Sequence, residues 1–240
     1  ARPNNIDHSP FSVLIEYQVR TDNNSVGEWL DVWNDRGEDA RVGEPETDAY
    51  VAAVNLADES NVLVFERYAN GQSSLDAHID RPAHGELMDA MGSRQMTKRR
   101  VMTTKFSDIG DYGWWARPGT ADPASPGVAL IALGFRFGSD SDLATYLEAS
   151  REHAAYCWDA EPDTLVYSAG LAMADADREI DLHTGDVVFV MACTDLAAVD
   201  KHANDPRHVA LMAELKASIQ MERTFIRSYK TTGNGFLWRC

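Results

Sequence analysis

Hydrophobic and polar positions along the chain change period in a regular order. The segment FSVLIEYQVR (11–20) alternates as a strand does, and SVGEWLDVWNDRGEDA (25–40) places Val26, Trp29, Leu30 and Trp33 on one helical face. There follow a strand after the Glu-Pro turn at 44–45, the apolar run NVLVFERY (61–68), a helix over 73–92 and a strand near 99–106. The order β-α-β-β-α-β, with right-handed crossovers, predicts an antiparallel sheet with both helices on one face, the ferredoxin-like arrangement.

The same order occurs twice in the chain. LDAHIDRPAHGELMDAM (75–91) matches VDKHANDPRHVALMAEL (199–215) without a gap, and six of the seventeen positions are identical, where average residue usage predicts about one. The correspondence also joins 61–70 to 185–194, 44–54 to 161–171, 14–20 to 130–136 and 96–105 to 221–230. Each copy is a unit of roughly a hundred residues, an ordinary domain size, so the chain is an internal duplication.

The strands carry bulky apolar side chains at both alternating positions, so the sheet face without helices also requires burial. The sheet of the other copy is the available cover. We therefore predict an α+β protein in which two ferredoxin-like βαββαβ repeats pack sheet to sheet as an intramolecular dimeric α/β barrel. The expected domains are 1–106 and 128–240. The Gly-, Pro-, Ser- and Asp-rich segment 107–127 is expected to connect them, with Tyr112, Trp114 and Trp115 pinning it onto the barrel.

The composition narrows the possible functions. The chain has 240 residues, 44% of them hydrophobic, and no apolar stretch approaches the ~18–20 residues that a membrane span needs. The N-terminal ARPNNIDHSP is polar and shows no signal peptide. The net charge of −16 leaves no basic stripe for phosphates, which argues against nucleic-acid partners. Cys157, Cys193 and Cys240 lack metal-binding spacing, which favours a reducing, cytoplasmic compartment.

Two pairs of matched segments carry a resemblance to a known family. They are EPETDAY (44–50) with EPDTLVY (161–167), and VFERYANGQSSLDAHIDRPAH (64–84) with DLAAVDKHANDPRH (195–208). With these motifs the chain resembles the antibiotic biosynthesis monooxygenase superfamily of dimeric α/β barrels, over nearly all of its length. The resemblance implies the barrel fold. It leaves the activity open, since the superfamily includes cofactor-independent oxygenases, quinone-forming enzymes, haem-degrading enzymes, isomerases and proteins without known chemistry.

Within that range we expect a cofactor-independent oxygenase that acts on an electron-rich aromatic or polyketide-like small molecule and O₂. Oxygenation without metal or flavin requires deprotonation of the substrate, so that its anion can pass an electron to O₂. A base that titrates near neutrality, an apolar cavity and a donor for the developing enolate oxygen would suffice. Two alternatives remain open: a non-catalytic small-molecule-binding or structural barrel, and an isomerase or decarboxylase that uses the same proton-removing pocket.

Histidine is the natural candidate for the base, because its unperturbed pKa of about 6.5 lies nearest to working pH. His78 and His202 occupy matched positions on the inward face of the repeated helix. We favour His78, because Arg67 and Tyr68 of the preceding strand are expected to orient the base or stabilise an oxyanion. The alternative is that both histidines only hold the helix where a proline interrupts it.

We expect no metal and no cofactor. His78 and His84 are six positions apart across a helix break, not at the spacing that aims two ligands at one ion. His84 and His208 are expected to be helix caps or surface residues. In haem-degrading relatives the axial histidine comes later on this helix, where this chain has Met88 and Met212, so the resemblance implies no haem.

Aromatic side chains are the candidates for a substrate slot. Tyr50 and Tyr167 occupy matched positions on the strand after the Glu-Pro turn, and a flat polycyclic ring would suit such a slot. The residues expected to bind substrate are Tyr17, Trp33, Tyr50, Trp158 and Tyr167. The competing interpretation is that these residues belong to the core. The strand VFERY has no polar counterpart in the second copy, so we expect one polar pocket and one more apolar pocket or scaffold.

Overall fold

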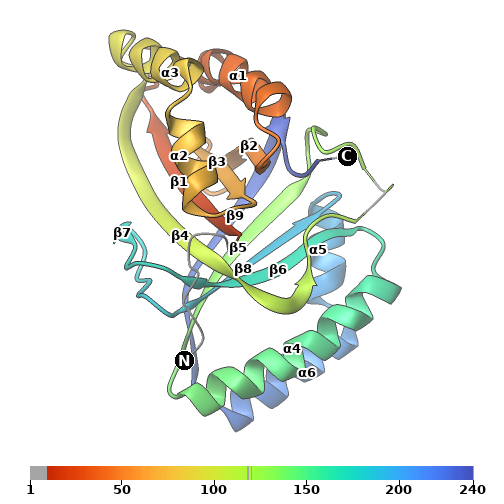
Figure 1. The fold of residues 1–240 in the computed structure, drawn as a ribbon. Helices are drawn as coiled ribbons and strands as arrows, with labels where there is room; N and C mark the ends of the chain where they lie inside the picture. Colours follow the sequence, from red (N-terminus) through yellow and green to blue (C-terminus); the bar gives the residue numbers. More distant parts are fainter. Residues whose placement is uncertain (1–9, 118, 120, 240) are drawn as a thin grey trace.

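The structure is a computed structural model that describes residues 10–117, 119 and 121–239 (Figure 1). The first half comprises β1 (Phe11–Val19), α1 (Val26–Gly43), β2 (Thr47–Asn55), β3 (Asn61–Tyr68), α2 (Gln72–Ile79), α3 (Pro82–Ser93) and β4 (Thr97–Trp114). The second half comprises β5 (Ala129–Phe137), α4 (Asp140–Ala160), β6 (Thr164–Ala172), β7 (Asp177–Arg178), β8 (Val187–Cys193), α5 (Leu196–Ala203), α6 (Pro206–Ser218) and β9 (Met221–Phe236). The N-terminal residues 1–9 and Cys240 lie outside the described residues.

Two elements differ from the predicted bounds. The single helix expected over 73–92 is two helices, α2 and α3, because Pro82 has no N–H to donate and instead starts a new helix at its first position. The strand expected near 99–106 begins at Thr97 and continues through 107–114, into the segment expected to connect the halves. Within the described residues, no helix combines the length and apolar character that a membrane crossing requires.

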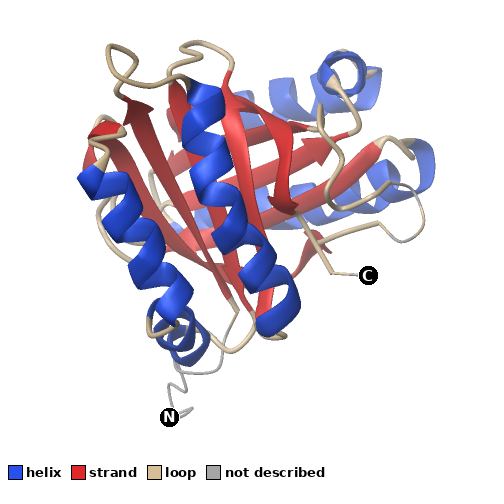
Figure 2. Cartoon of the chain, turned by 90° about the horizontal axis from the view of Figure 1, so that it is seen from above, coloured by secondary structure: helices blue, strands red, loops and turns tan. Residues whose placement is uncertain are grey.

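The strands close into a barrel. Their order is β1-β3-β2-β9-β5-β8-β6-β4, β1 also pairs with β4, and the two-residue β7 pairs with the outer edge of β4. Within the halves the orders β4-β1-β3-β2 and β9-β5-β8-β6 are those of two ferredoxin-like sheets. The predicted tandem α+β arrangement is confirmed. In addition, the two sheets are hydrogen-bonded to each other along the seams β2–β9 and β4–β6, and the helices lie outside the barrel (Figure 2).

The helix-free faces of both sheets form one shared core inside the barrel. Buried side chains from both halves contribute to this core, among them Leu14, Phe65, Met102, Leu130, Val188 and Tyr229. A second core lies between each sheet and its own helices. The apolar residues at both strand positions are thereby explained, because each strand faces the barrel interior on one side and the helices on the other.

The strand ladders correct the alignment of the two copies in one strand. Thr47 pairs with Tyr68 in the first half, and Thr164 pairs with Cys193 in the second. Tyr68 therefore corresponds to Cys193, and by the same register Glu66 corresponds to Met191. The gapless alignment instead pairs Tyr68 with Ala192 and Glu66 with Val190, so it is wrong by one position in this strand. The difference matters because adjacent strand residues point to opposite faces of the sheet.

Each half contributes an arginine that caps the first helix of the other half. Arg117, which follows β4, donates to the carbonyls of Cys157, Trp158, Glu161 and Thr164 at the end of α4. Arg239, which follows β9, donates to the carbonyls of Ala40, Arg41, Glu44 and Thr47 at the end of α1. These contacts add to the backbone hydrogen bonds that Ala40, Glu44, Cys157 and Glu161 already accept at the helix ends. They tie each Glu-Pro turn to the other half of the chain.

Candidate functional site

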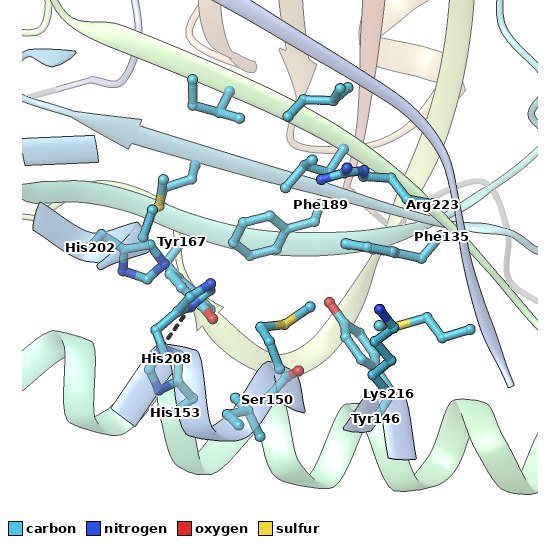
Figure 3. Close-up of a pocket in the computed structure, with 18 of the residues that line it drawn as sticks. Phe135, Tyr146, Ser150, His153, Tyr167, Phe189, His202, His208, Lys216 and Arg223 are labelled. Atoms are coloured by element: carbon cyan, nitrogen blue, oxygen red, sulfur yellow. Dashed lines mark hydrogen bonds between the residues drawn. The ribbon is translucent and has the colours of Figure 1, made fainter. Parts of the chain in front are cut away.

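The second half has a cavity of about 610 Å³ between its sheet and its helices, and exposed residues at one end open it to solvent (Figure 3). Strands β5, β6, β8 and β9 form one wall, and α4, α5 and α6 form the other. Histidines gather at one end of the cavity, and Lys216 and Arg223 lie toward the other. The lining residues labelled in Figure 3 are Phe135, Tyr146, Ser150, His153, Tyr167, Phe189, His202, His208, Lys216 and Arg223. Its size and largely apolar walls suit a small aromatic molecule.

The cavity is open because a small residue stands where the first half has a tryptophan. Helices α1 and α4 both end at a Glu-Pro turn, and counting back equally from Glu44 and Glu161 places Trp33 at the position of Ser150. Trp33 is 1% exposed, so its indole fills the space in the first half. A separate cavity of about 140 Å³ in the first half lies at the Glu-Pro turn and α2, with His78 in its lining.

Each half contains a glutamate–histidine pair built from the same two elements. His202 on α5 has Nδ1 2.8 Å from a carboxylate oxygen of Glu161, and the hydroxyl of Thr164 donates to the same carboxylate over 3.1 Å. His78 and Glu44 repeat the 2.8 Å contact in the first half. Because Glu161 accepts a hydrogen bond from Nδ1–H, the neutral imidazole of His202 carries its lone pair on Nε2.

A fixed positive charge distinguishes the first half. Arg36, at the position of His153, has Nη2 2.7 Å from Nδ1 of His78 and 2.6 Å from a carboxylate oxygen of Glu44. Burial raises the pKa of Glu44, but the hydrogen bond and charge of His78, with Thr47 and Arg36, outweigh it and lower the pKa to about 2. His78 is 1% exposed. It therefore belongs to a packed ionic network.

Three histidines from three helices meet at one end of the larger cavity (Figure 3). One ring nitrogen each of His153 on α4, His202 on α5 and His208 on α6 lies within 4.8 Å of the other two. Nδ1 of His208 is 3.4 Å from Nε2 of His153. Burial, with the neighbouring His202 and His153, lowers the pKa of His208 to about 4, and burial with His202 lowers the pKa of His153. Both imidazoles are therefore neutral near neutral pH.

Of the two aromatic residues predicted to bind substrate in the second half, one lines the cavity and the other does not. Tyr167 lines the cavity, with its ring 4.7 Å from that of Phe189 and 6.1 Å from that of His202. Trp158 is 42% exposed and is not part of the lining. Its ring packs edge-on against Trp114 and under the guanidinium of Arg117, so the structure places it with the helix cap and not with the cavity.

The residues predicted in the first half mostly gather around His78. The rings of Tyr50 and Tyr68 lie 4.9 and 5.5 Å from the imidazole, and Trp33 packs against Tyr50 at 4.6 Å. Burial and the neighbouring Glu66 raise the pKa of Tyr68, whose hydroxyl donates to that carboxylate. These side chains fill the interior with little space between them.

Tyr17 and Arg67 lie apart from that group. Tyr17 packs 6.0 Å from Trp29, and burial raises its pKa to about 12. Arg67 points into the barrel, on the opposite face of β3 from Tyr68, where it pairs with Asp108 and covers the ring of Trp115. The structure therefore does not bring Arg67 to His78.

Hydroxyl groups also line the cavity. Ser150 and Tyr146 face it from α4, and the hydroxyl of Tyr112 donates to that of Tyr146 over 3.3 Å. Burial raises the pKa of Tyr146 and of Tyr167. Both phenols therefore stay protonated and can donate hydrogen bonds to an oxygen of a bound molecule.

Sequence reasoning missed several of these residues. The sequence explains Glu161 as part of a turn and His208 as a cap or surface residue, and its pattern does not mark His153 or Ser150. The motif Glu-Pro-x-Thr, present before the second strand of both copies, was an available sign that the glutamate has a function beyond the turn. The histidine cluster had no such sign, because its members come from three separate helices.

Solved structures of similar fold span the whole chain at low identity. A candidate monooxygenase from Lactobacillus acidophilus aligns over 97% of this chain and 100% of its own, with a TM-score of 0.68 and 11% identity. A candidate monooxygenase from Fusobacterium nucleatum aligns over 97% of this chain and 98% of its own, with a TM-score of 0.69 and 13% identity. An anthrone oxidase-like protein covers 95% and 93%, with a TM-score of 0.56 and 9% identity.

No protein-family model and no curated protein matches the sequence. The likeness to these solved structures extends over 97% of this chain and at least 98% of theirs, so it includes the tandem arrangement. The predicted resemblance to the monooxygenase superfamily is confirmed at the level of the fold.

Proposed function

We propose that the protein is a cofactor-independent oxygenase that converts an electron-rich aromatic or polyketide-like small molecule in the cavity of the second half. The observation that carries the proposal is the arrangement of His202. This histidine lines a largely apolar cavity of about 610 Å³ and is oriented from behind by Glu161 at 2.8 Å. A buried carboxylate behind an imidazole fixes the tautomer that presents a basic nitrogen to a substrate.

The proposed reaction begins with proton removal. Nε2 of His202 accepts a proton from an acidic C–H or O–H of the substrate, and Glu161 stabilises the resulting imidazolium. The substrate anion passes one electron to O₂, and the substrate radical and superoxide combine as a peroxide. At a methylene carbon the peroxide loses water, so that CH₂ and O₂ become C=O and H₂O.

Hydroxyl groups in the cavity support the developing anion in this proposal. The hydroxyls of Tyr146 and Ser150 are positioned as donors to a substrate oxygen, and the aromatic walls exclude water from the anion. Lys216 and Arg223 are exposed and lie at the end away from the histidines. In a chain of net charge −16 this pair favours substrates with an anionic substituent.

The first half acts as a scaffold in this proposal. Sequence analysis favoured His78 as the base, with Arg67 and Tyr68 as its helpers. We assign the base to His202 instead, because Trp33 fills the corresponding space in the first half and Arg36 holds Nδ1 of His78 at 2.7 Å. The candidate monooxygenases and the anthrone oxidase-like protein of similar fold agree with an oxygenase on this scaffold.

The test compares the two matched histidines in the intact protein. With an anthrone or hydroquinone as substrate, we expect His202→Gln to lower the rate of oxygen uptake by about 10²–10⁴-fold, the usual cost of losing a general base. His78→Gln should keep the rate and lower the thermal midpoint, because it breaks a buried ionic network.

Other outcomes contradict the proposal. Equal rates for His202→Gln and the parent protein would remove His202 from the reaction. If the parent binds these aromatic compounds without consuming oxygen, the protein is a binding protein, or an isomerase or decarboxylase that uses the same base. Product analysis under anaerobic conditions then separates the binding protein, which forms no product, from the isomerase or decarboxylase, which does.

A further inference from the structure

We propose that His153, His202 and His208 form a binding site for a divalent transition-metal ion of the zinc class, at the histidine end of the cavity. Imidazole nitrogen is a favoured ligand of such ions, and three histidines with one open position form a known type of zinc site. The proposal concerns binding and does not rest on the proposed reaction.

The distances between the ring nitrogens fit one ion. Three of them, one from each histidine, lie within 4.8 Å of one another, and Nδ1 of His208 is 3.4 Å from Nε2 of His153. Zinc–nitrogen bonds of about 2.0–2.1 Å in tetrahedral geometry separate two ligand nitrogens by roughly 3.3 Å. One pair is therefore already at bonding separation, and the nitrogen of His202 lies within 4.8 Å of both.

The orientation of His202 also suits a metal ligand. Its Nδ1 is engaged by Glu161 at 2.8 Å, so Nε2 is the nitrogen left for an ion. A carboxylate behind a ligating histidine is the usual supporting contact at zinc sites, where it fixes the ring and raises its basicity. Thr164 donates to Glu161 in turn, which holds the carboxylate in this position.

The three ligands sit on α4, α5 and α6, which pack on the same sheet. Figure 3 shows their rings turned toward one another beside the cavity. The fourth coordination position of a bound ion would therefore face the cavity, where water or a small molecule can reach it. Ligand spacing along the sequence does not predict this set, because its three histidines come from three different helices.

The first half provides an internal comparison. His78 and His84 correspond to His202 and His208, but Arg36 stands at the position of His153, with its guanidinium 2.7 Å from Nδ1 of His78. A permanent positive charge at that distance repels a cation. The duplication therefore predicts that the ion binds in the second half and not in the first.

The experiment titrates metal-free full-length protein with zinc chloride by isothermal calorimetry and measures the thermal midpoint with and without zinc. We expect equimolar binding and a raised midpoint, because the ion binds the folded state. His208→Gln and His153→Arg, which copies the first half, should lose both effects. His84→Gln, the matched control, should keep both, and Glu161→Gln should weaken binding by about 10–100-fold.

A direct readout does not depend on the variants. In the parent protein, zinc should shift the imidazole ¹⁵N resonances of three of the seven histidines. Comparison with the spectra of His153→Arg and His208→Gln identifies these three resonances as those of the proposed site. Unchanged histidine resonances, no zinc binding, or equal binding in His153→Arg, His208→Gln and the parent would each overturn the site. Because the ion takes the lone pair assigned to the base, zinc that inhibits oxygen uptake agrees with both proposals. Zinc that activates it keeps the site and overturns the cofactor-free reaction.

Discussion

At the scale of single residues, differences at two matched positions make the first half filled and the second half open. The glutamate–histidine pair is the same in both halves, at 2.8 Å. In the first half, Trp33 fills the space beside the pair and Arg36 adds a positive charge. In the second half, Ser150 and His153 leave a cavity beside a cluster of three histidines. The same pair therefore acts as an ionic support in one half and is available to a ligand in the other.

The pKa of Glu44 gives a prediction for stability against pH. Its folded pKa of about 2 lies below the ordinary value of 4.5. The charged carboxylate therefore contributes stability that is fully present above pH ~4.5 and is lost as the pH falls toward ~2. Glu44→Gln should lower the thermal midpoint near neutral pH, and the difference from the parent should shrink as the pH falls to ~3.

Thermal denaturation across that pH range measures the effect. Glu38→Gln is the control, because Glu38 pairs with Arg41 on the exposed face of α1 and should change the midpoint little. A difference between parent and Glu44→Gln that is independent of pH would contradict the assigned ionic pair.

At the residue scale, repetition at matched positions singles out His78 and His202 in the sequence, and their site roles stay predictions. The sequence does not single out their partners Glu44 and Glu161, because a glutamate beside a proline is equally well explained by the turn. Arg67 was expected near His78, but the face on which a strand residue points depends on the register of pairing, which the sequence did not define within one residue.

At the scale of elements, the two longest strands join the halves. β4 pairs with β1 and then with β6, and β9 pairs with β5 and then with β2. Both strands end in a similar motif, GWWAR (113–117) and GFLWR (235–239). Gly113 and Gly235 have φ of 70° and 82°. A Cβ would collide with the carbonyl oxygen of Tyr167 at Gly113 and with that of Tyr50 at Gly235, so both positions require glycine.

The arginine at the end of this motif gives the prediction for this scale. Arg239→Ala removes hydrogen bonds to the carbonyls of Ala40 and Arg41 in α1 and of Thr47 at the start of β2, and each such bond contributes about 0.5–1.5 kcal/mol. We expect a clear loss in the free energy of unfolding, measured with urea. Arg239→Lys should recover little of it, because an ammonium cannot reproduce the planar guanidinium fork. Parent-like stability of Arg239→Ala would contradict the capping role.

The order of helices and strands was predictable because hydrophobic periodicity and duplication reinforce each other. The length of β4 was not, because SDIGDYGWW (107–115) has the polar, glycine-containing composition of a linker. Its strand conformation comes from pairing with β6, a strand of the other half. Long-range pairing of this kind leaves no mark in local composition, although the repeated glycine–aromatic–arginine motif was available to find it.

At the scale of the whole molecule, the chain is a barrel that neither half can close alone. Separating the halves would expose four strand edges, those of β2, β4, β6 and β9, and the apolar interior of both sheets. Exposed edges and apolar faces drive association. Residues 1–117 or 121–240, expressed alone, should give dimers or insoluble protein by size-exclusion chromatography with light scattering. A stable monomeric half would contradict the shared core.

The central claim is that the cavity of the second half is the substrate site, and one substitution tests it most directly. Ser150→Trp places in that cavity the residue that fills the first half. The measurement is calorimetric binding of an anthrone, with Glu152→Trp, on the exposed side of the same helix, as the control of equal bulk. We predict that Ser150→Trp loses binding while circular dichroism shows it folded, and that Glu152→Trp binds as the parent does. Parent-like anthrone binding by folded Ser150→Trp would contradict the account and place the site elsewhere.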